Sequence, residues 1–227
     1  MQDMAERRNR SGRPVAGATS RSRRLHGRLA GGSPGSRRRD DRGAPAEERL
    51  HIRRATAGDV PALNALIARS GRILSRGYYT DAETDSALRY VFGVDSALIE
   101  DGSYFVVEEA GTTLGCGGWS RRRTLYGGDQ RPMGAADLLN PATDPARIRA
   151  FFVAPEAARR GVGRALLDAC MQAAAEAGFR SLELMSTLPG VPFYLANGFE
   201  EVEPVADTLP DGVVLRFVRM RRDLPGA

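Results

Sequence analysis

Two spacings of apolar residues run along the chain from residue 50 onward, and each predicts a different kind of element. Alternating or continuous apolar runs, bounded by glycine, proline and polar residues, predict strands. The turn around Gly111 makes two of these strands a hairpin. The predicted strands lie at 50–55, 103–110, 113–122, 147–153 and 181–187, with two closing strands near 199–205 and 213–221.

Apolar residues recur every three or four positions in the intervening segments and predict four helices. The first two begin after Thr56 and Thr80, which have side chains suited to an N-cap. A long helix follows Gly161 and ends at Gly178, because glycine readily takes the left-handed turn that stops a helix. A short helix begins at Pro192.

The order of these elements, β-α-α-β-β-β-α-β-α-β-β, predicts an α/β fold of the α+β type. Strands 147–153 and 181–187 flank the long helix, which implies a parallel, right-handed crossover. The other strands are expected to be antiparallel. We therefore expect one domain from 50 to 227, built on a mixed, mostly antiparallel central sheet with helices on both faces.

Residues 1–49 have a different composition from the rest of the chain. They contain no Phe, Trp, Tyr or Ile, and they hold 13 arginines against 6 acidic residues. So few apolar groups cannot offset the entropy of ordering, and the segment is predicted to be a disordered tail. A nucleic-acid-binding arm and an organelle-targeting peptide are alternatives, but no aromatic residues are interleaved to stack on bases and the acidic residues oppose targeting. We favour a solvated extension and expect no nucleic-acid partner.

Cysteine usage and the lack of a predicted membrane helix or secretory signal favour a cytoplasmic protein. The chain has two cysteines, Cys116 and Cys170, and two spaced thiols favour a reducing compartment and buried side chains. No run of about 18 apolar residues predicts a membrane helix, and no apolar stretch marks a secretory signal. His, Cys and acidic residues do not cluster at metal-ligand spacing, so no metal is expected.

The turn that opens the long helix is the candidate ligand site. Gly161 and Gly163 have no Cβ, so a ligand can approach the backbone closely. The first N–H groups of a helix lack internal partners and favour an anion. Arg159 and Arg160 add positive charge, which makes a diphosphate a natural candidate.

Two known phosphate loops do not fit this turn. A P-loop needs Lys and Ser or Thr after its last glycine, whereas Arg164 and Ala165 follow Gly163. A dinucleotide fingerprint needs a third glycine where Leu166 stands. A helix that merely begins with glycines remains an alternative.

The segments around the turn carry a resemblance. Val153-Ala154-Pro155 precedes it, and the pattern Phe193-Tyr194-x-x-x-Gly198-Phe199 follows it. This combination resembles the GNAT family of acyl-CoA-dependent N-acyltransferases, over 50–223 in element order and specifically over 147–199. The resemblance implies acetyl-CoA as co-substrate. Ala158 departs from the Arg or Gln common there, so pyrophosphate contacts would rest on backbone amides.

The resemblance also implies roles in the chemistry. Backbone N–H groups near Phe151 to Val153 would polarise the thioester carbonyl, and Tyr194 would give a proton to the departing thiolate. The alternative for Tyr194 is an aromatic residue packed on the sheet. The expected cofactor-binding residues are Phe151, Phe152, Val153, Arg159, Arg160, Gly161, Val162, Gly163 and Arg164.

No residue is marked out as the general base. Glu183 in a strand and Asp129 in a loop are weak candidates, and Glu183 is interpreted as a surface strand residue. His26 lies in the tail, and His51 opens the first strand. Many relatives use ordered water to carry the proton away, so the resemblance does not require a base.

The expected function is acetyl transfer from acetyl-CoA to a primary amine of a small molecule or a protein, with a homodimer as one assembly. The alternative is a non-catalytic acyl-CoA-binding module that senses cofactor or docks a partner.

The long connection 124–146 is either a binding loop or a surface insertion. The acidic run at Asp81, Glu83 and Asp85 could attract an amine, but we favour a helix N-terminus. Four rings could wall the acceptor pocket or pack in the core: Tyr78, Tyr79, Trp119 and Tyr126.

Overall fold

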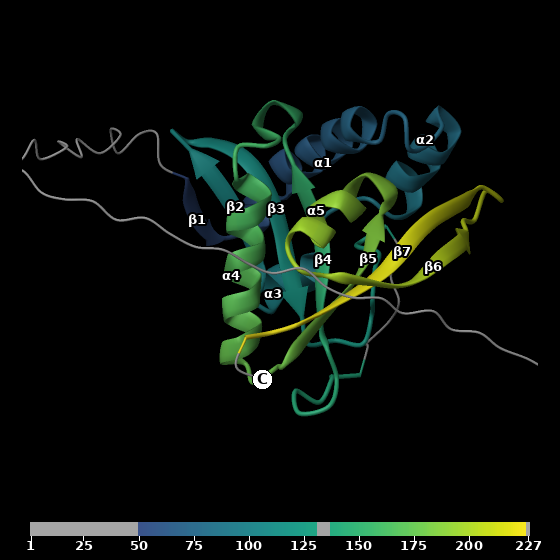
Figure 1. Ribbon diagram of the computed structural model, residues 1–227. Helices are drawn as coiled ribbons and strands as arrows, with labels where there is room; N and C mark the ends of the chain where they lie inside the picture. The colour runs from purple at the N-terminus through teal and green to yellow at the C-terminus, as the bar shows by residue number, and fades with distance from the viewer. Residues whose placement is uncertain (1–49, 131–136, 226–227) are drawn as a thin grey trace, which may run out of the picture. The chain divides into compact units, whose positions relative to one another are not determined.

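A seven-stranded sheet forms the centre of the protein (Figure 1). The computed structural model describes residues 50–130 and 137–225, so the predicted tail and part of the 124–146 connection lie outside the described residues. The predicted division of the chain at residue 49 therefore stays a prediction. The strands are β1 (His51–Arg54), β2 (Tyr104–Glu109), β3 (Thr112–Ser120), β4 (Ala146–Val153), β5 (Ser181–Thr187), β6 (Glu200–Thr208) and β7 (Val214–Asp223).

The sheet order is β1-β2-β3-β4-β5-β7-β6. Strands β4 and β5 are parallel, and every other neighbouring pair is antiparallel. The predicted fold class, with its single parallel crossover, is confirmed. Strand β7 lies between β5 and β6, so the closing hairpin pairs with the sheet through its second strand.

Helices lie on both faces of this sheet. Figure 1 shows α4 and α5 on one face and α1 behind the sheet on the other, with α2 beside α1. Short 3-10 turns occur at Ala57–Asp59, Pro155–Ala157 and Leu188–Gly190. The α-helices are α1 (Val60–Leu74), α2 (Asp81–Tyr90), α3 (Ser96–Glu100), α4 (Val162–Glu176) and α5 (Val191–Ala196).

The two threonine caps differ in outcome. Thr80 and Glu83 form the predicted capping box, in which the Glu83 N–H donates to the Thr80 hydroxyl at 3.2 Å and the carboxylate accepts from the Thr80 N–H at 2.8 Å. Thr56 instead caps a 3-10 turn, and α1 begins only at Val60. Helix α3 was not predicted, because five residues are too few to show a helical spacing.

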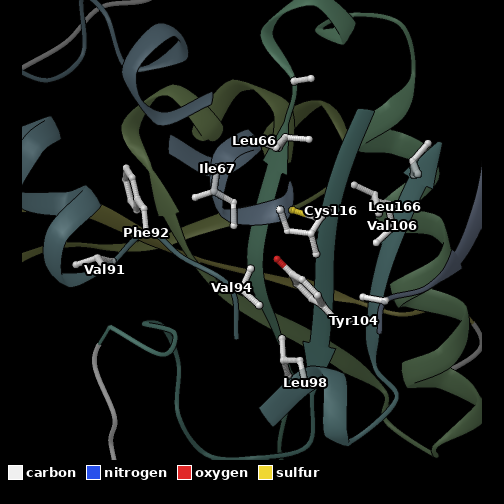
Figure 2. Close-up of a cluster of buried hydrophobic side chains, with 14 of the residues drawn as sticks. Leu66, Ile67, Val91, Phe92, Val94, Leu98, Tyr104, Val106, Cys116 and Leu166 are labelled. Carbon is white, nitrogen blue, oxygen red and sulfur yellow. The ribbon is translucent and has the colours of Figure 1, made fainter. Parts of the chain in front are cut away.

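The main apolar cluster joins helix α1 to the sheet. Figure 2 shows Leu66 and Ile67 of α1 beside Tyr104, Val106 and Cys116 from β2 and β3. All five side chains are buried. Burying a large apolar side chain contributes about 1.5–3 kcal/mol, so this cluster holds α1 against the sheet.

A glycine in β3 allows α4 to approach the sheet from the other face. A Cβ at Gly115 would lie 2.7 Å from Cγ1 of Val162 and 3.3 Å from Cδ1 of Leu166. Only glycine leaves room for these two side chains. The beginning of α4 is therefore packed directly on the centre of the sheet.

Strand β4 has a bulge at Ala150, where its register with β3 shifts. Its φ is +51°, a left-handed conformation that costs a residue with a Cβ about 1–2 kcal/mol. The hydroxyl of buried Tyr104 donates a hydrogen bond to the Ala150 carbonyl oxygen at 3.0 Å. Parallel pairing between β4 and β5 ends at Ile148 and Leu184, just before this point. The two strands diverge beyond it.

A buried carboxylate joins β4, β5 and β7 where β4 and β5 are still paired. Glu183 of β5 forms ion pairs with Arg147 and with Arg219, and its side chain is only 8% exposed. Burial lowers the pKa of Arg147 from its ordinary value. The interpretation of Glu183 as a surface strand residue was wrong, because the two guanidinium groups allow a carboxylate to be buried here.

We expect Glu183→Gln to lower the free energy of unfolding by about 3 kcal/mol, because Arg147 would stay buried without its counterion. Urea denaturation measures the change. Glu203→Gln is the matched control: Glu203 also contacts Arg219, at 2.9 Å, but it is 54% exposed. Its loss should cost less than about 1 kcal/mol. An equal loss of unfolding free energy in the two variants would show that burial does not determine how much these ion pairs contribute.

Candidate functional site

A pocket of about 470 Å³ lies where β4 and β5 diverge. Its wall comes from the end of α1, the segment after α2, the loop at 125–127, β4, the end of β5, the turn before α4, and α5. Figure 1 shows α4 and α5 in front of this part of the sheet. The pocket therefore joins elements that are far apart in the sequence.

Eight of the ten predicted site residues line this pocket. The other two, Arg160 and Val162, do not. The Arg160 guanidinium contacts the Glu109 carboxylate at 2.6 Å, and the Val162 side chain is buried. Their expected contribution is through backbone amides. The eight lining residues are Phe151, Phe152, Val153, Arg159, Gly161, Gly163, Arg164 and Tyr194.

The turn before α4 presents open backbone. Gly161 is the N-cap of α4 with φ +85°, and no side chain caps the helix there. Apart from its chain neighbours and the adjacent helix backbone, no heavy atom of the described residues lies within 4 Å of the place a Cβ of Gly161 would take. The neighbouring Arg159 also has a positive φ, +67°, and is exposed. The first N–H groups of α4 can thus reach an anion in the pocket.

Gly163 is needed for packing as well. A Cβ at this position would lie 3.2 Å from the ring of Phe193, so the glycine lets α5 approach α4 closely. The sequence led us to expect only ligand approach at Gly163. A substitution at this residue would therefore disturb α5 and the pocket together.

The backbone of β4 offers hydrogen-bond groups to the pocket. Beyond Ile148 the edge of β4 that faces β5 has no strand partner, whereas the opposite edge pairs Phe152 with Cys116 of β3. Successive N–H groups along a strand point to opposite edges. At least one N–H of 151–153 is therefore directed to the side where β5 has moved away.

Tyr194 lies at the pocket with its ring in an aromatic cluster. Its ring centroid is 5.1 Å from that of Phe193, 5.3 Å from Phe199 and 6.5 Å from Phe151. Burial raises the pKa of the Tyr194 phenol above its ordinary value. The hydroxyl therefore keeps its proton throughout the neutral range, and it is a weaker acid than an exposed tyrosine.

None of the candidate bases lines the pocket. Glu183 is held by its two arginines. Asp129 accepts hydrogen bonds from the N–H and the hydroxyl of Ser96, at 2.8 and 2.6 Å, and so caps α3. His51 is exposed at the start of β1, on the edge of the sheet.

Arg149 is a charged lining residue that sequence reasoning missed. It is 8% exposed, and its Nη2 lies 2.7 Å from Oδ2 of Asp95 and donates to the Gly127 carbonyl oxygen at 2.7 Å. Burial raises the pKa of Asp95, an effect that the Arg149 charge opposes. An arginine in the middle of an apolar strand pattern was the signal available in the sequence.

The predicted acceptor rings separate in the structure. Tyr126 lines the pocket, and its ring centroid is 5.3 Å from that of Phe217. Trp119 packs on Phe179, away from the pocket. Tyr78 is exposed, and buried Tyr79 donates to the Arg216 carbonyl oxygen at 2.5 Å.

The two thiols are buried, as predicted. Burial raises the pKa of Cys116 to about 12 and also raises that of Cys170. Burial disfavours the thiolate form of both, and neither cysteine lines the pocket. Within 50–130 and 137–225 there is no group of three or more His, Cys, Asp or Glu able to hold a metal ion. No helix in these ranges is long and apolar enough to cross a membrane.

Solved structures with the same fold are N-acetyltransferases. A GCN5-related N-acetyltransferase from Rhodopseudomonas palustris has a TM-score of 0.58 at 18% identity, covering 80% of this chain and 100% of its own. The PaiA N-acetyltransferase of Thermoplasma acidophilum, solved with coenzyme A, has a TM-score of 0.53 at 13% identity, with 77% and 99% covered. An N-acetyltransferase from Staphylococcus aureus Mu50 has a TM-score of 0.52 at 17% identity, with 78% and 99% covered.

A comparison with curated protein sequences finds no match. Residues 100–201 match the family model described as an acetyltransferase (GNAT) domain. This range includes β4, the turn before α4 and the whole of α5. The segment that matches this model contains all ten predicted site residues, and the fold around it is that of the solved N-acetyltransferases.

Proposed function

We propose that this protein transfers the acetyl group of acetyl-CoA to a primary amine. One observation carries the proposal: the open turn before α4, the unpaired edge of β4 and the side chain of Tyr194 all border one pocket. These are the three features that acyl transfer from a thioester uses: an anchor for the diphosphate, a donor for the carbonyl oxygen and a proton for the leaving sulfur.

The residues at the α4 end of the pocket fit a CoA diphosphate. The backbone N–H groups from Gly161 to Arg164 would hold it, with the exposed Arg159 adding positive charge. The backbone at Gly161 is open, so phosphate oxygens can approach without meeting a side chain. When bound, acetyl-CoA supplies an acetyl group activated as a thioester.

The chain itself supplies orientation and a proton. An N–H of Phe151 to Val153 would donate to the carbonyl oxygen as negative charge develops on it. Tyr194 would hold a proton at its hydroxyl oxygen, and burial raises the pKa of the phenol further above the neutral range. The aromatic rings around Tyr194 make its surroundings apolar.

We place the reaction in the cytoplasm, because two buried free thiols favour a reducing compartment. The acceptor is an amine of a small molecule or a protein, and a homodimer is one assembly in which the domain could act. Release of free CoA thiol in the presence of acetyl-CoA and an amine tests the proposal. Tight acetyl-CoA binding without thiol release from any amine would instead identify a non-catalytic binding module.

Arg159→Gln should raise the Kd of acetyl-CoA about 1.4- to 5-fold, because an exposed charge near a phosphate contributes roughly 0.2–1 kcal/mol. Isothermal titration calorimetry measures the change. Arg160→Gln is the matched control: its guanidinium contacts Glu109 and does not line the pocket. Equal weakening by both variants would argue against a diphosphate at the pocket side of the turn.

Tyr194→Phe should lower kcat about 10²- to 10⁴-fold, because it removes a proton donor and keeps the packed ring. Acetyl-CoA affinity should stay near that of the parent. Tyr78→Phe is the control: it removes the hydroxyl of an exposed tyrosine that does not line the pocket, so it should leave kcat nearly unchanged. Near-parental turnover by the Tyr194 variant from about pH 6 to about pH 9 would make Tyr194 a packing residue.

A further inference from the structure

We propose that the acceptor is an apolar monoamine, an alkyl or arylalkyl amine without a second charged group. This inference rests on the proposed acetyl transfer and concerns the half of the pocket that lies away from the α4 turn. It is carried by the chemistry of that half: apolar and aromatic walls, hydroxyl groups and no carboxylate among the described lining residues.

Two groups of elements line the pocket, and each group defines what we call one half of it. The turn before α4 and helix α5 form one half, which contains Gly161, Arg159 and Phe193. The end of α1, the segment after α2 and the loop at 125–127 form the other. A CoA thioester anchored at the α4 turn fills the first half. The amine must therefore reach the carbonyl carbon from the second.

The wall of the second half is apolar. Leu74, Phe92, Leu125, Tyr126 and Phe217 line it. The Tyr126 and Phe217 rings lie 5.3 Å apart at their centroids, so together they form a broad aromatic surface. Such a wall stabilises a bound molecule in proportion to the apolar area that it removes from water.

Apart from Arg149, the polar side chains of this half are neutral. Ser70 and Ser75 at the end of α1 contribute hydroxyl groups, which can accept a hydrogen bond from a neutral amine and pass on its proton. An ammonium group buried here would lose its hydration without gaining a counterion. The site therefore favours the uncharged form of the amine, which is also the nucleophilic form.

No acidic residue of the described chain lines the pocket, and its charged lining side chains are Arg149, Arg159 and Arg164. The six residues at 131–136, Arg-Pro-Met-Gly-Ala-Ala, include no acid in their sequence. A polyamine or a lysine beside further basic residues would bring a second ammonium group to a wall whose described residues offer no carboxylate as counterion. The unpaired desolvation of that charge therefore disfavours these acceptors.

The acidic run on α2 does not change this balance. Glu83 accepts from the Thr80 N–H in the capping box and lies 3.7 Å from Arg216. Asp85 lies 4.0 Å from Arg72 at the surface. None of the three acids of the run lines the pocket, so none can hold a second ammonium group there.

Arg149 does not make the site a receptor for carboxylates either. Its Nη2 contacts Asp95 at 2.7 Å and the Gly127 carbonyl oxygen at 2.7 Å. The charge of Asp95 balances that of Arg149. An amino acid acceptor would have to bury its carboxylate beside a guanidinium group that is already neutralised. The second half therefore fits neither a dication nor a zwitterion.

The test compares acceptors on the full-length protein, with acetyl-CoA binding measured separately by calorimetry. 2-Phenylethylamine, spermidine, glutamate and a lysine-containing peptide are assayed for thiol release. We expect kcat/KM for 2-phenylethylamine to exceed that of each of the others at least about 10-fold, the scale on which apolar pockets discriminate.

A pair of variants at Leu74, the half-buried last residue of α1, tests the charge argument directly. Leu74→Glu places a carboxylate on the acceptor wall, and Leu74→Gln is its neutral match in shape. The Glu variant should raise the kcat/KM ratio of spermidine to 2-phenylethylamine about 10-fold over the Gln variant. An unchanged ratio would show that the wall does not select against cations.

The outcomes separate this inference from the proposed function. Failure to bind acetyl-CoA would overturn the acetyl-transfer proposal itself. Binding with transfer to spermidine, glutamate or the peptide in preference to 2-phenylethylamine would leave acetyl transfer intact and overturn the apolar acceptor. Binding without any transfer to 2-phenylethylamine would overturn it as well.

Discussion

The left-handed backbone at Ala150 is the constraint on which the pocket depends. An uninterrupted β4 would pair with β5 along its whole length and bond its N–H groups to that strand. The turn at Ala150, held by the Tyr104 hydroxyl, ends the pairing at Ile148 and opens the edge at 151–153. Burial of Tyr104 in the apolar core therefore fixes the geometry of the site from behind. Local strain held by its surroundings is typical of functional sites.

The charged side chains of the described residues that line the pocket are all arginines. Buried acids are balanced by arginines: Glu183 by Arg147 and Arg219 outside the pocket, and Asp95 by Arg149 on the pocket wall. Of the exposed arginines at the α4 turn, Arg160 contacts Glu109 and Arg164 contacts Asp168, and neither acid lines the pocket. Positive potential is thus concentrated at the cofactor end, and the acceptor end is nearly neutral.

Most of the fold could be predicted from the sequence, because apolar spacing and capping residues are local signals. Strand β5 and the capping box at Thr80 have the predicted positions. The five-residue α3 and the 3-10 turn after Thr56 were missed, since neither is long enough to show a period. The buried state of Glu183 could not be predicted, because its two arginines come from strands distant in sequence. The glycine motif predicted that Gly161 lies at the ligand site. The close approach of Phe193 to Gly163 could not be predicted, because it depends on tertiary packing.

Backbone amide chemical shifts, measured by ¹H–¹⁵N correlation spectroscopy during titration with CoA and then with acetyl-CoA, test the central claim most directly. The account predicts that both ligands shift the amides of Gly161, Gly163 and Arg164. It further predicts that the spectra with the two ligands differ mainly at 151–153, where the acetyl carbonyl would bind. Shifts confined to residues outside the pocket, or no difference between the two ligands at β4, would contradict the account.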